Sequence, residues 1–115
     1  MAVQDYTFTE GAGKTYRHVW TITDSDTGDP AEIPGATDRT VQVTGTFGGT
    51  TITLQGSLEE TPTNWFTLTD PLGNDVTFSA AGAVTIMENA TWIRPSESGG
   101  SSVSVEVTLL SKSTV

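Results

Sequence analysis

The chain has no cysteine, only five basic residues, a single histidine and no long apolar run. Without cysteine, neither a disulfide framework nor a thiolate metal site can form, so stability must come from packing. No stretch approaches the roughly 20 apolar residues of a membrane-spanning helix, and residues 1–11 lack the basic and apolar regions of a signal peptide. We therefore expect no membrane partner and a protein made in an aqueous compartment.

Positive charge is scarce, and this limits the possible partners. Fourteen acidic residues outweigh the five basic ones, giving a formal net charge of -9. Such a field repels the phosphate backbone of DNA or RNA. The sequence predicts no nucleic-acid partner.

The elements of a catalytic site are missing as well. His18 is the only histidine, and no serine or acid stands at a recognisable catalytic spacing from it, whereas a triad needs a nucleophile, a base and an orienting acid. We interpret His18 as a structural residue and Glu59 and Glu60 as surface charge. We expect no enzyme activity, no catalytic residue and no cofactor.

One acidic turn allows a metal hypothesis. Asp24 and Asp26 stand two residues apart in a segment that ends at Asp29, and such carboxylates can converge on calcium. The segment departs from the EF-hand loop, which requires a third acid or asparagine before the glycine and a glutamate six residues after it. The interpretation adopted is an acidic surface turn without a metal.

What the chain does contain is typical of a β protein. Threonine, serine and glycine are abundant, 35% of the residues are hydrophobic, and the length of 115 residues suits one domain. Apolar and polar residues alternate between turn signals, and no apolar period of 3.6 persists. We predict an antiparallel, jelly-roll-like β-sandwich of roughly 8 strands over residues 14–115. Residues 1–13 are predicted to be an N-terminal arm or an edge strand.

Individual strands follow from the alternation. Residues 14–24 place Trp20 inward, two strands around Gly48-Gly49 are predicted to form a hairpin, and Pro95 is expected to end a strand. A short edge strand is expected near Glu32. The other side chains expected to point inward are Tyr16, His18, Ile22, Val41, Val43, Phe47, Ile52, Leu54, Phe66, Leu68, Val103, Val105, Val107 and Leu109.

Four aromatic residues are the candidates for partner binding. Tyr6 and Phe8 lie in the N-terminal segment, which could become ordered on a partner. Trp65 lies opposite Phe66 and Leu68, so it is the tryptophan that we expect to be exposed. With Trp92 it could contact either a protein or the apolar face of a sugar.

Three segments resemble a known group of proteins. They are VQVTGTFGGTTITLQGS (residues 41–57), NWFTLTDPLGNDVTFSAAG (64–82) and WIRP (92–95). Their G-x-F-G-G hairpin, N-W before a T-L-x-D-P-x-G-N turn, and I-R-P before a final V-x-V-x-L strand resemble small virion proteins of tailed bacteriophages, over roughly residues 38–110. Related sequences often read G-S-N-D-G where this chain has residues 56–60, GSLEE.

The resemblance implies a head decoration or cement protein. Such a protein is made in the host cytoplasm, binds the major capsid protein on the outer surface of the virion and bridges capsomers, as a homo-oligomer (dimer or trimer). A capsid lattice would convert weak contacts into firm attachment. The alternative is a carbohydrate- or receptor-binding module of a phage tail that uses Trp65 or Trp92, and a third hypothesis is a tail-tube or neck component.

Overall fold

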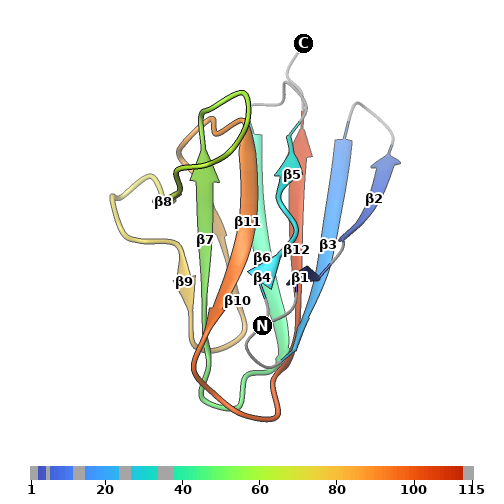
Figure 1. Cartoon of the computed structure of the whole chain (residues 1–115), viewed down its shortest axis with the longest axis vertical. Coiled ribbons are helices and arrows are strands. Elements are labelled where there is room, and N and C mark those ends of the chain that lie inside the picture. The colour runs from blue at the N-terminus through green and yellow to red at the C-terminus, as the bar shows by residue number, and fades with distance from the viewer. Residues whose placement is uncertain (1–2, 5, 12–14, 24–26, 34–37, 113–115) are drawn as a thin grey trace.

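The structure is a computed structural model that describes residues 3–4, 6–11, 15–23, 27–33 and 38–112. All regular structure in these residues is β-strand, arranged in two stacked sheets (Figure 1). The predicted β-sandwich is confirmed. The described residues form twelve strands. This number exceeds the predicted eight because five of the strands are only two residues long.

Sheet B contains five strands in the order β10-β6-β12-β3-β2, and all neighbours are antiparallel. The last strand in sequence, β12, lies between β3 and β6 at the centre of this sheet. The N-terminal segment was predicted to be an arm or an edge strand, and its residues 6–11 form the edge strand β2. The bounds are β2 (Tyr6–Gly11), β3 (Thr15–Thr23), β6 (Asp38–Thr46), β10 (Gly82–Thr85) and β12 (Ser104–Lys112).

Sheet A is built on the antiparallel pair β7 and β11, and short strands flank this pair on both sides. The short strand expected near Glu32 is present as β5. The bounds are β1 (Val3–Gln4), β4 (Thr27–Gly28), β5 (Ala31–Glu32), β7 (Thr51–Ser57), β8 (Phe66–Thr67), β9 (Thr77–Phe78) and β11 (Trp92–Ser98).

The core lies between the sheets and follows the two-residue alternation. Successive side chains of a strand point to opposite faces, so every second residue is removed from water. Each fully buried aliphatic side chain contributes about 1.5–3 kcal/mol. The buried side chains of sheet B are Trp20, Ile22, Val41, Val43, Val105, Val107 and Leu109, and those of sheet A are Ile52, Leu54 and Ile93. All of them except Ile93 were predicted to point inward, and that prediction is confirmed.

The predicted hairpin at Gly48-Gly49 is wrong in its pairing. The turn itself is present, because Thr50 N donates a hydrogen bond to Phe47 O (2.9 Å) and both glycines have positive φ. However, β6 belongs to sheet B and β7 to sheet A. The turn therefore carries the chain across the sandwich.

A second crossing explains why the first is stable. Strands β11 and β12 also lie in different sheets, so that β6 pairs with β12 and β7 with β11 along one continuous ribbon. At the crossing Ser101 N donates to Gly48 O (3.0 Å), and the Thr50 hydroxyl donates to Glu97 Oε1 (2.5 Å). This folded ribbon, visible at the lower end of Figure 1, joins the two sheets of the sandwich.

Pro95 does not end its strand, contrary to the prediction. It pairs with Leu54 in register, and β11 continues to Ser98. On its other side β11 meets β4 and β5, which are separated by Asp29 and Pro30. Proline lacks a backbone donor, and it is tolerated here because the neighbouring ladder is interrupted at the same place.

Candidate functional site

The free edge of sheet B carries an aromatic surface. Strand β2 pairs with β3 on one side, and the described residues supply no strand for its other side. Its residues from Thr7 to Gly11 are exposed. We call Tyr6, Phe8, Tyr16 and His18 the aromatic edge. An edge strand of this kind presents backbone groups to which another chain can pair.

Ring contacts hold the aromatic edge together. Phe8 stacks on Tyr16 with ring centroids 6.2 Å apart, and it contacts the His18 ring at 4.9 Å. Tyr6 packs against both His18 and Trp20. By register Phe8 lies opposite the buried His18, yet it remains 49% exposed. The sheet face is therefore left partly uncovered at this edge.

His18 is buried, as expected for a structural histidine. Burial lowers the pKa of its imidazole below the ordinary value, because the charged form would be desolvated. Its Nδ1 has no hydrogen-bond partner among the described residues. The ring is therefore neutral near pH 7 and acts as part of the aromatic packing.

The two tryptophans proposed for binding lie in a different place, on the outer face of sheet A. The Arg94 guanidinium carbon lies 4.0 Å from the centre of the Trp65 ring, and Arg94 Nε donates to Gln55 Oε1 (2.9 Å). The indole of Trp92 donates to Glu60 O (3.3 Å). Trp65 is half-buried and not the exposed residue predicted, because Arg94 covers one face of its ring. Phe66, predicted to point inward, is 36% exposed where β8 borders β7, whereas Leu68 is buried.

Sequence reasoning missed the role of Glu59. Its carboxylate accepts hydrogen bonds from the backbone amides of Thr63 (2.9 Å) and Asn64 (2.7 Å), and also from the Asn64 side-chain amide (3.0 Å). These hydrogen bonds lower the pKa of Glu59 to about 2, and the bond from the Asn64 backbone amide has the largest effect. The acid is thus the organiser of the loop before β8. No spacing rule in the sequence signals this, because the partners are backbone groups.

The Glu59 loop is expected to loosen in acid. Because the pKa falls on folding, from 4.5 to about 2, the contribution of Glu59 is complete above pH 4.5 and is lost as the pH falls through about 2. The Thr63 and Asn64 amide resonances should follow this titration in a series of NMR spectra. In a Glu59→Gln variant the same resonances should not titrate in that range. A midpoint near 4.5 in the original chain would contradict the assignment.

Metal ligands do not converge within the described part of the chain. No group of three or more histidine, cysteine or acidic residues is placed to hold an ion there. In the acidic turn proposed as a calcium site, residues 24–26 lie outside the described residues. Asp29 uses its backbone carbonyl to accept a hydrogen bond from the Trp20 indole (2.9 Å).

Comparison with models of protein families, with curated protein sequences and with solved structures finds no match to this chain. The described residues include no helix of the length and hydropathy needed to span a bilayer. Two surfaces of the protein are candidates for binding a partner. The first is the aromatic edge of sheet B, and the second is the cluster of Trp65, Arg94 and Trp92 on sheet A.

Proposed function

We propose that this chain is a structural virion protein that binds the outer surface of a tailed-phage capsid and stabilises it by bridging capsomers. The observation that carries the proposal is the aromatic edge, where an edge strand and a half-exposed Phe8 lie side by side. The partner is the major capsid protein. The chain acts as a dimer or trimer, so that several weak contacts combine on the lattice.

The edge offers two kinds of contact to such a partner. A strand of the capsid protein would continue sheet B beyond β2 through backbone hydrogen bonds. Burial of the Phe8 ring would add apolar contact at the same place. Because β2 is already paired with β3 in the unbound protein, binding does not carry the entropy cost of ordering this strand.

Charge favours the outside of the shell for this role. The net charge of -9 opposes contact with packaged DNA. It does not prevent a partner strand from pairing with β2, because Glu10 is the one charged residue of that strand. The proposal therefore combines an edge that can pair with a surface that avoids nucleic acid.

Binding to undecorated capsids tests the proposal. We expect the purified chain to be taken up stoichiometrically and Phe8→Ser to weaken uptake at least about tenfold, because burial of a phenylalanine contributes about 1.5–3 kcal/mol. Co-sedimentation over a concentration series measures both. Leu72→Ser is the matched control, because Leu72 is 87% exposed on a turn beside sheet A and its loss should leave uptake unchanged. Absence of uptake by the unmodified chain would overturn the proposal.

The tail-module alternative receives less support from the geometry. A sugar that stacked on Trp65 would have to displace Arg94 from the face that the guanidinium covers or use the other face. Trp92 is tied to the backbone of the Glu59 loop. Glycan-array binding that is lost in Trp65→Ala would favour this alternative over the capsid role.

A further inference from the structure

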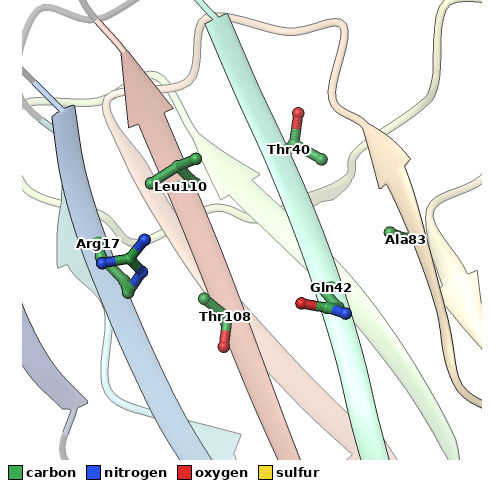
Figure 2. A pocket seen from close by; sticks show the side chains of 6 residues that line it. All are labelled: Arg17, Thr40, Gln42, Ala83, Thr108 and Leu110. Atoms are coloured by element: carbon green, nitrogen blue, oxygen red, sulfur yellow. The ribbon is translucent and has the colours of Figure 1, made fainter.

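The outer face of sheet B contains a hollow of about 340 Å³ that is separate from the aromatic edge. Its side chains come from four neighbouring strands in two rows. One row crosses Arg17, Leu110 and Thr40, and the other crosses Thr108, Gln42 and Ala83. Figure 2 shows these six side chains on four adjacent strands, β3, β12, β6 and β10.

The hollow results from the sizes of its side chains. Ala83 and the two threonines are short, while Arg17 and Gln42 are longer. Leu110 lies on the outward face of β12 together with Glu106 and Thr108, and its side chain is half-buried there. The hollow thus combines a small apolar surface with hydroxyl and amide groups.

Arg17 is the feature that points to a ligand. Its side chain is exposed, and the guanidinium makes no hydrogen bond or ion pair with the described residues, although the protein carries a net charge of -9. The other described arginines are engaged: Arg39 donates to Ala90 O (2.8 Å), and Arg94 donates to Gln55 and stacks on Trp65. A planar guanidinium with all its donors available is suited to a carboxylate or a phosphate.

The chemistry of the lining selects between these anions. No acidic side chain lines the hollow, and the Thr40 and Thr108 hydroxyls and the Gln42 amide can donate to a second oxygen. A multiply charged phosphate ligand would be repelled by the acidic protein around the hollow, whereas a single carboxylate meets less opposition. The volume lies at the small end of the range for ligand sites, which fits one residue of a peptide.

We infer that this hollow binds one peptide carboxylate, with Arg17 as the anion ligand and with Leu110 and Ala83 in contact with the adjoining aliphatic carbons. The carboxylate comes either from an acidic side chain or from the C-terminus of a chain. The inference does not depend on capsid binding, because the hollow lies on the outer face of sheet B and the aromatic edge continues the face that carries the core.

Titration by NMR with three acetylated tripeptides tests the inference on the full labelled chain. The first ends in leucine with a free carboxylate, the second is the same peptide as an amide, and the third is an amide with a central glutamate. We expect saturable shifts at Arg17, Gln42 and Thr108 with one or both carboxylate peptides. Binding only of the first would assign a chain terminus, and binding only of the third would assign an acidic side chain.

Two variants decide whether Arg17 is responsible. Arg17→Gln should weaken binding roughly tenfold or more, because hydrogen bonds between charged groups are the strong ones. Lys112→Gln removes a cation from the same sheet face but outside the hollow, and should leave binding within about twofold. Equal binding of the amide peptide, an equal loss in both variants, or no saturable shift would overturn the inference.

Discussion

Replacing Gly45 by alanine is expected to lower the free energy of unfolding by about 3–4 kcal/mol, because it combines backbone strain with a steric clash. Gly45 has a φ of 123°, a conformation that side-chain-bearing residues rarely adopt. A Cβ at this position would lie 2.3 Å from Ser104 O and 2.9 Å from Val105 Cα. Both atoms are backbone of the central strand β12, so neither can move without disturbing the sheet.

Gly73→Ala is the matched control for this prediction. Gly73 also has a positive φ (87°), but nothing lies within 4 Å of the position that its Cβ would occupy. The control should cost about 1 kcal/mol, from backbone strain alone. Urea denaturation of both variants measures the difference. Equal effects would show that close contact with β12 contributes nothing.

Trp20→Ala should be the most destabilising single substitution in the core, by about 3–5 kcal/mol. Trp20 is fully buried in β3 of sheet B, and its indole donates to Asp29 O beside β4 of sheet A. It also supports Tyr6 of the aromatic edge, with ring centroids 5.6 Å apart. Its loss thus opens a cavity and removes a link between the two sheets.

Trp20→Phe separates the two contributions. It keeps an aromatic ring but loses the hydrogen bond to Asp29, which is worth about 1 kcal/mol, together with part of the packing. Chemical denaturation followed by circular dichroism should rank the original chain above Trp20→Phe and Trp20→Ala last. Since a domain of this size has a net stability of about 5–15 kcal/mol, the alanine substitution should remove a large share of it. Similar stabilities for the two variants would contradict the cavity argument.

The strands that were predicted correctly are those in which the face of each residue is decided locally. In β3, β6 and β12 the alternation alone places Trp20, Val41 and Val107 in the core, because the pleat repeats every two residues. The pairing of strands was not accessible in the same way. Gly48-Gly49 has the same turn chemistry whether the chain returns within one sheet or crosses to the other.

The surfaces were harder to predict than the core, because they depend on segments that are distant in sequence. Trp65 loses exposure to Arg94, a residue on a strand formed 29 positions later in the chain. The hollow around Arg17 needs four strands in register before it exists. Pro95 is accommodated only because the ladder beside it is interrupted between β4 and β5. In each case the deciding contact is non-local, and periodicity carries no information about it.

The central place of β12 in sheet B also has a consequence for biosynthesis. Strands β3 and β6 do not pair with each other, and each needs β12 as its neighbour. While the ribosome is still making β12, the apolar faces of β3 and β6 are therefore exposed on the nascent polypeptide. The centre of sheet B can therefore form only after residues 104–112 have been synthesised, because these residues join β3 to β6.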